Sequence, residues 1–213
     1  MQIRNKRILI DDIPVEDIAE QFGTPVYVYS AKRIEQNFRR VQKAFSAHYE
    51  NVAIHYAIKA CNNLRIAKIL VDLGAGIDAA SPNEIRLAQA LGVDPSKITF
   101  TGNNLSDEDL RFAFQSGATI NLDDDSYLDR LLKIGRPSVV AFRINPGGSS
   151  GDSPSDDLAP FSGPQAKFGV WSDRVWLAYE RVKTAGITRV GAHMMRGSKE
   201  CDWARLKMRP QYC

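Results

Sequence analysis

Short apolar strand patterns alternate with amphipathic helical patterns through most of this chain, and this alternation limits the possible folds more than any other feature. Strands joined by helical crossovers must run parallel, because a helix returns the chain to the edge from which the strand started. The rhythm therefore predicts a parallel sheet, either an open doubly wound sheet or a (β/α) barrel. Six predicted strands of this sheet lie at residues 51–60, 76–81, 97–102, 119–124, 138–147 and 189–194.

Helix-start and helix-stop residues support this division of the chain. Ser81 followed by Pro82 begins one helix, which Gly92 ends, and Ser106 begins the next, which Gly117 ends. Serine accepts a hydrogen bond from a free N–H at a helix start, and glycine adopts the left-handed conformation that often closes a helix. A further strand over 24–30, followed by a helix over 31–45, is predicted before the first of the six units.

The two faces of the predicted strands differ in size and polarity. In 138–147, Val140 and Phe142 lie on one face, whereas Ala141 and Arg143 lie on the other. Strands of a doubly wound sheet are apolar on both faces, because helices cover both. An apolar outer face and a small, polar inner face favour a barrel. We therefore predict an α/β protein of the (β/α)8 TIM-barrel type.

Charged or titratable side chains gather at the carboxyl ends of the predicted strands, where barrel enzymes hold their active sites. A lysine amine at such a place can form a Schiff base with a carbonyl compound, as it also does in class I aldolase-type barrels. A glycine–serine pair after the sixth strand offers N–H groups and a hydroxyl to a phosphate. The strand-end residues are Lys59, Asp78, Asp123, Arg143 and His193, and the pair is Gly197–Ser198.

Composition excludes several other classes of protein. The 28 basic and 25 acidic residues give a net charge of +3, too small to indicate nucleic-acid binding. No apolar run approaches the ~20 residues of a membrane-spanning helix. Three cysteines without metal-ligand spacing indicate neither a disulfide framework nor a metal site, and they favour the reducing cytoplasm.

Several segments, in order, resemble the fold-type III pyridoxal 5'-phosphate (PLP)-dependent decarboxylases, the diaminopimelate/ornithine/arginine decarboxylase group. These segments are HYAIKACNN, LGAGIDAASPNEI, ITFTGNNLSDEDL, TINLDDDSYLDRL, VAFRINPG, AKFGV and GAHMMRGS. The resemblance runs from about residue 22 to 199. Linked motifs in one order are more specific than any single motif. The sequences of these motifs are most similar to those of diaminopimelate decarboxylases.

The resemblance implies a role for each candidate site residue. Lys59 would hold PLP through a Schiff base, with Asp78 and Arg143 near the cofactor's phenolate side and His193 close to the cofactor. Where the family usually has a second histidine that stacks on the PLP ring, this chain has Met195. A thioether packs on an aromatic ring but donates no proton.

The same resemblance implies that Gly197 and Ser198 contact the cofactor's phosphate. The implied reaction is loss of an amino acid's α-carboxylate as CO2, most simply meso-diaminopimelate to L-lysine. Decarboxylation of ornithine, arginine or carboxynorspermidine, and a non-catalytic PLP-binding regulator, are the alternatives. Full-length relatives are expected to be homodimers.

The resemblance also divides the chain. Residues 1–30 would be an N-terminal segment with a strand of a missing C-terminal β-domain, 31–199 a partial PLP-binding barrel, and 200–213 a divergent tail. Six predicted strands fall short of the eight of a closed barrel, so we expect a truncated chain with weak or no activity. The Gly-, Ser- and Asp-rich segment 147–169 is predicted to be a lid or binding loop.

Overall fold

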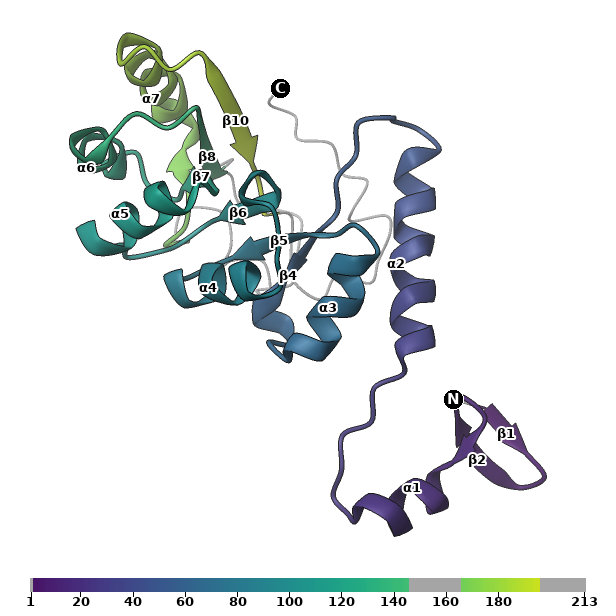
Figure 1. Cartoon of the computed structure of the whole chain (residues 1–213). Helices are drawn as coiled ribbons and strands as arrows, with labels where there is room; N and C mark the ends of the chain where they lie inside the picture. The colour runs from purple at the N-terminus through teal and green to yellow at the C-terminus, as the bar shows by residue number, and fades with distance from the viewer. Residues whose placement is uncertain (1, 146–165, 196–213) are drawn as a thin grey trace.

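A curved parallel sheet with helices along its outer side dominates the structure (Figure 1). The structure, a computed structural model, describes residues 2–145 and 166–195. Six strands form the main path of the sheet in the order β10-β8-β7-β6-β5-β4. They are β4 (His55–Ala57), β5 (Gly76–Ala79), β6 (Ile98–Phe100), β7 (Thr119–Leu122), β8 (Val139–Asn145) and β10 (Arg189–His193).

The order of these strands decides between the two predicted architectures. The six strands lie side by side in the same order as they occur in the sequence, and each pairs in parallel with its neighbours. A doubly wound sheet reverses its strand order partway, whereas a barrel proceeds in one direction. The barrel-type prediction is therefore confirmed. The helices of the outer side are α3 (Leu64–Asp72), α4 (Pro82–Ala90), α5 (Asp107–Ser116), α6 (Tyr127–Ile134) and α7 (Ser172–Thr184).

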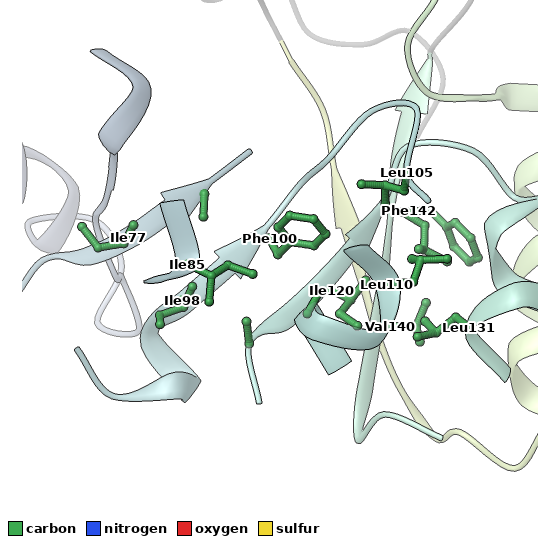
Figure 2. Packing of buried hydrophobic residues seen from close by; sticks show 14 of the residues in the cluster. Ile77, Ile85, Ile98, Phe100, Leu105, Leu110, Ile120, Leu131, Val140 and Phe142 are labelled. Atoms are coloured by element: carbon green, nitrogen blue, oxygen red, sulfur yellow. The ribbon is translucent and has the colours of Figure 1, made fainter. Parts of the chain in front are cut away.

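The main hydrophobic core lies between the sheet and these helices, as the strand faces predicted. Figure 2 shows apolar side chains of the strands meeting those of the helices in one continuous layer. Burying this layer is what holds the sheet in its curve against the helices. The fully buried members labelled there include Ile77, Ile98, Phe100, Ile120, Val140 and Phe142 from the sheet and Ile85, Leu110 and Leu131 from the helices.

The predicted helix caps are present. Ser106 and Asp109 form a reciprocal capping box at the start of α5, and Gly117 ends that helix at φ 75°. The Ser81 hydroxyl accepts from the N–H of Glu84, 3.3 Å away, at the start of α4. The Glu84 carboxylate accepts from the N–H of Ala80 at 2.7 Å, so it secures the loop that enters the helix.

The predicted strand over 51–60 is much shorter in the structure. Only β4 pairs with the sheet, and the chain then tightens into the 3₁₀ turn η1 (Ile58–Ala60), which contains Lys59. The Tyr56 hydroxyl donates to the carbonyl oxygen of Cys61 at 3.0 Å, which holds this turn closed. The turn forms because the chain must leave the sheet and reverse toward α3.

The N-terminal region differs most from the prediction. Residues 24–30 form no strand, and the side chains from Val26 to Tyr29 are exposed. A strand needs a neighbour for its backbone hydrogen bonds, and no described strand lies beside this segment. An antiparallel sheet, β1 (Gln2–Arg4), β2 (Arg7–Ile10) and β3 (Ile13–Pro14), and helix α1 (Val15–Phe22) precede it and were not predicted.

The turns of this small sheet carry a signal that the sequence analysis missed. Asn5 and Lys6 lie at φ 53° and 65° between β1 and β2, and Asp11 and Asp12 at 49° and 67° between β2 and β3. Two successive residues at positive φ are typical of tight hairpins, for which asparagine and aspartate are well suited. Whether residues 1–30 also serve a further domain stays a prediction.

Helix α2 (Ala31–Ser46) confirms the helix predicted over 31–45. Its Phe38 packs with Leu70 and Ala75 in a second, smaller core beside α3. The 3₁₀ turn η2 (Pro95–Lys97) leads into β6, and β9 (Val170–Trp171) pairs in parallel with the end of β8. None of the described helices is both long and apolar enough to cross a membrane.

Candidate active site

The inner face of the sheet is lined by small and polar side chains. Neighbours in a parallel register share a face, so Asp78 lies beside Ala57 and Thr99 on the inner side. Farther along, Ala141 lies beside Gly191, and a Cβ added to Gly191 would approach the Ala141 Cβ to 3.1 Å. Small side chains therefore occupy this part of the inner face.

Lys59 lies just beyond β4, in η1 rather than on the strand itself. Its neighbour Ile58 is fully buried in the outer core, whereas Lys59 is exposed. Ile58 therefore anchors the turn in the core, and Lys59 lies outside that core. The lysine predicted at the tip of the strand is therefore at the carboxyl edge of the sheet, on a turn.

His193 brings the charged side chains of the predicted site together. It ends β10, beside Arg143 of β8. Burial is the main cause that lowers the pKa of His193, and the positive charges of Arg143 and Lys59 lower it further, whereas the Asp78 carboxylate opposes them. Predicted residues from three other elements thus contribute to the electrostatic surroundings of one histidine.

The imidazole of His193 also contacts an amide that the sequence analysis did not single out. Asn121 Nδ2 lies 2.9 Å from His193 Nδ1 and 3.0 Å from the hydroxyl oxygen of Thr101. The Asn121 side chain is 1% exposed, and its Oδ1 has no hydrogen-bond partner among the described residues. Buried polar atoms without partners are rare in folded proteins.

Arg143 lies between an acid and an aromatic ring. Its Nη1 is 3.6 Å from Asp123 Oδ1, and its guanidinium carbon is 4.3 Å from the centre of the Phe168 ring. Asn103 donates to the other oxygen of Asp123 at 2.5 Å. Burial raises the pKa of Asp123, and the Asn103 hydrogen bond and the Arg143 charge oppose that rise. Burial also lowers the pKa of Arg143, which the Asp123 charge opposes.

The remaining predicted residues lie at or beyond the edge of the described structure. Met195 is half-buried, two residues after the end of β10. Gly197, Ser198 and the tail 200–213 lie outside the described residues, as does most of the predicted loop 147–169. Within 2–145 and 166–195, no group of three or more histidine, cysteine, aspartate or glutamate side chains is arranged to hold a metal ion.

Asn121 and Thr101 are the main site residues that sequence reasoning missed. Asn121 interrupts an apolar strand between Ile120 and Leu122, and both of those neighbours are fully buried against the helices. An amide at the centre of a strand whose neighbours face the core must point to the opposite, inner face. That placement was the available signal, but the contact with His193, 72 residues away, was not visible in it.

Comparison with known proteins agrees with this architecture. A family model described as "Pyridoxal-dependent decarboxylase, pyridoxal binding domain" matches residues 31–208. The chain is 38% identical over 196 residues to the diaminopimelate decarboxylase of Methanothermobacter thermautotrophicus, covering 92% of this chain and 45% of that protein. It is 35% identical to the diaminopimelate decarboxylase of Thermoplasma acidophilum, covering 92% and 47%.

A solved structure shows the same fold. The crystal structure of diaminopimelate decarboxylase from M. jannaschii superposes with a TM-score of 0.83 and 30% identity, covering 96% of this chain and 49% of that one. The chain thus spans about half the length of the curated relatives it matches. Because the family model covers most of the sequence, this chain belongs to the pyridoxal-dependent decarboxylase family, and residues 31–208 match the pyridoxal-binding domain of that family.

Proposed function

We propose that this protein belongs to a PLP-dependent enzyme that decarboxylates meso-diaminopimelate to L-lysine with PLP bound at Lys59, and that the 213-residue chain alone has weak or no activity. One observation carries the proposal: an exposed lysine stands at the carboxyl edge of the barrel sheet, directly after the strand that pairs with Asp78 of β5. Arg143 and His193 lie side by side at the ends of β8 and β10. Active sites of barrel enzymes lie at this edge. The names of the relatives at 35–38% identity supply the reaction.

The residues present fit the cofactor chemically. Lys59 supplies a primary amine for the cofactor's aldehyde. Ala57, Ala141 and Gly191 leave room for a flat ring above the sheet. A primary amine beside a sheet face of small side chains is suited to a planar aldehyde cofactor.

Each residue has a separate task in this proposal. Lys59 would hold the cofactor covalently as a Schiff base, Arg143 and Asp78 would orient it through charge, and Met195 would pack its thioether on the ring. Gly197 and Ser198 would bind the phosphate. When bound, the cofactor supplies an electron sink that lets the substrate's α-carboxylate leave as CO2. The protein's part is to orient the carboxylate and to restrict water and protons around it.

The choice of substrate rests on the relatives. One structure of the M. jannaschii enzyme is described as a co-complex with L-lysine, at 28% identity and a TM-score of 0.82. L-lysine is the expected product of our proposed reaction. Relatives described as arginine or lysine decarboxylases match at 24% and 23% identity, which supports the fold alone.

The attachment of the cofactor can be tested directly. The protein is incubated with PLP, reduced with borohydride, digested and analysed by mass spectrometry. A pyridoxyl group on Lys59 is expected, and it should vanish in Lys59→Ala but persist in Lys68→Ala. Lys68 is an exposed lysine of α3 that pairs with Asp72, so it is a matched control. An adduct on other lysines alone would refute the proposal.

The substrate is tested on a version of the protein extended to the full length of its relatives, by measuring CO2 release from meso-diaminopimelate, ornithine, arginine and carboxynorspermidine. We expect meso-diaminopimelate to be the preferred substrate. Preference for another of these amino acids would replace our assignment within the family. A protein that carries the Lys59 adduct, releases no CO2 and binds a protein partner would be a regulator.

The proposal also includes the setting of the enzyme. We propose a cytoplasmic enzyme whose full-length form is a homodimer, on the basis of the family resemblance and of a cysteine content that suits a reducing compartment. Light scattering after size-exclusion chromatography of the protein extended to full length tests the dimer. A monomer of that extended protein at micromolar concentration in the presence of PLP would contradict this part.

A further inference from the structure

A polar chain crosses the inner face of the sheet and ends on His193. It runs from Thr101 after β6, through Asn121 on β7, to His193 at the end of β10. Strand β8 lies between β7 and β10, and its residue in register with Asn121 is Ala141. The alanine methyl is short enough for the amide to reach past it. The small residue and the long-range contact are therefore parts of one arrangement.

The direction of these hydrogen bonds fixes the proton on the imidazole. Asn121 Nδ2 carries two N–H groups, one directed at the Thr101 hydroxyl oxygen and one at His193 Nδ1. A ring nitrogen that accepts a hydrogen bond carries no proton, so the proton of the neutral ring is on Nε2.

We propose that Asn121 is a positioning residue that holds His193 as a neutral imidazole with its proton on Nε2. In this state His193 offers one hydrogen-bond donor to the group bound inside the sheet and adds no charge there. The role of that donor rests on the proposed function, whereas the choice of the protonated nitrogen rests on the hydrogen bonds of Asn121 with Thr101 and His193. Asn121 touches His193 and is not itself a catalytic residue.

The charges around the ring favour the same state. Among the described residues, those acting on His193 are Arg143 on β8, Lys59 in η1 and Asp78 on β5. Two positive charges face one negative charge, and the ring is half-buried. Burial and the two cations both disfavour the imidazolium form. The amide selects the nitrogen that keeps the proton, and the surroundings keep the ring neutral.

Turning the Asn121 amide over gives the competing arrangement. Oδ1 would then accept from a proton on His193 Nδ1, and the two N–H groups of Nδ2 would take the buried position that Oδ1 now occupies. That position has no partner among the described residues. One unpaired acceptor is replaced by two unpaired donors, which is the costlier state for a buried amide.

Nitrogen-15 NMR of the histidine rings tests this inference, because the two ring nitrogens have distinct shifts in each tautomer. The chain has only three histidines, so His193→Gln identifies the signal. We expect the Nε2–H tautomer in the wild-type protein. Asn121→Asp keeps the shape but replaces the donor with an acceptor, so the proton should move to Nδ1. The pKa of His193 should then rise by at least about 1 unit, a tenfold change in its protonation equilibrium.

Two further variants complete the test. Asn83→Asp makes the same change on the exposed surface of α4 and should leave the His193 signals unchanged. Thr101→Val removes the acceptor that orients the amide, so both tautomers should appear even if Asn121→Asp does not fold. An Nδ1–H tautomer in the wild-type protein would overturn the inference. So would ring-nitrogen shifts of His193 that are the same in Asn121→Asp and Thr101→Val as in the wild-type protein.

The measurement is made on the protein with and without added PLP. The tautomer is read without catalysis, so it separates this inference from the proposed function. The expected tautomer without a pyridoxyl group on Lys59 would refute the proposed function and leave the role of Asn121 standing. The pyridoxyl group together with the opposite tautomer would refute the role of Asn121 alone.

Discussion

Replacing Leu131 with alanine tests the core that holds the barrel wall in place. Leu131 of α6 is fully buried and lies in the layer that contains Leu110 and Val140 (Figure 2). The substitution removes three carbon atoms, worth about 2.4 kcal/mol at ~0.8 kcal/mol for each buried methylene. The cavity left behind adds to this, because the surrounding helices and strands relax only partly. We therefore expect the free energy of unfolding to fall by about 3–4 kcal/mol.

Denaturant unfolding followed by circular dichroism measures the loss, and thermal unfolding should show a Tm lower by about 6–16 °C for a chain of this size. Leu177→Ala is the matched control, because Leu177 of α7 is 56% exposed. That substitution should cost less than about 1 kcal/mol. If Leu131→Ala costs no more than Leu177→Ala, Leu131 does not pack α6 on the sheet in solution.

Three other predictions concern the backbone, a buried acid and the site histidine. Gly169→Ala should lower the free energy of unfolding by about 2–3 kcal/mol, because Gly169 has φ 88° and the new Cβ would lie 2.9 Å from a backbone nitrogen of β8. Gly186→Ala, at φ 82° with open space around it, should lower it by only about 1 kcal/mol. Equal losses in the two variants would exclude the clash at Gly169. Asp125→Asn should lower the free energy of unfolding by about 1.5–3 kcal/mol, because this buried carboxylate accepts from two arginines of α7 at 2.8 and 3.2 Å. Asp107→Asn, at an exposed ion pair, should lower it by less than about 1 kcal/mol. A larger loss in Asp107→Asn than in Asp125→Asn would contradict the role of the buried carboxylate. The pKa of His193 is lower in the folded than in the unfolded protein. Its contribution to stability is therefore complete above the unfolded-state pKa of about 6.5 and is lost as the pH falls through the folded-state pKa. Unfolding curves between pH 8 and pH 5 should show this loss in the wild-type protein and less of it in His193→Gln.

Much of the fold was predictable because the relevant signals are local. The side-chain alternation along β7 and β8 identified the buried outer face, and Ser106 and Gly117 marked the ends of α5. Each signal depends on residues within about four positions of one another, as helix caps and strand faces do. Together with the parallel rhythm, these signals were enough to favour a barrel.

The same local reasoning failed where pairing decides the structure. Residues 24–30 have strand composition, yet no described strand lies beside them, so they form no strand, and the side chains from Val26 to Tyr29 are exposed. The strand predicted through Lys59 ends at Ala57, because the chain must turn toward α3. A strand exists only where a neighbour accepts its hydrogen bonds, and composition does not reveal the neighbour.

The sequence by itself determined the number and order of the barrel units, the face of each strand that enters the core, and the candidate residues at the strand ends. Only the tertiary structure decided that Lys59 lies on a turn and that Asn121 reaches past Ala141 to His193. The contacts of Asn121 join positions 20 and 72 residues apart. The physical reason is that periodicity is set between neighbours in the chain, whereas a hydrogen bond between strands depends on how the sheet curves and on which side chains are small enough to leave room.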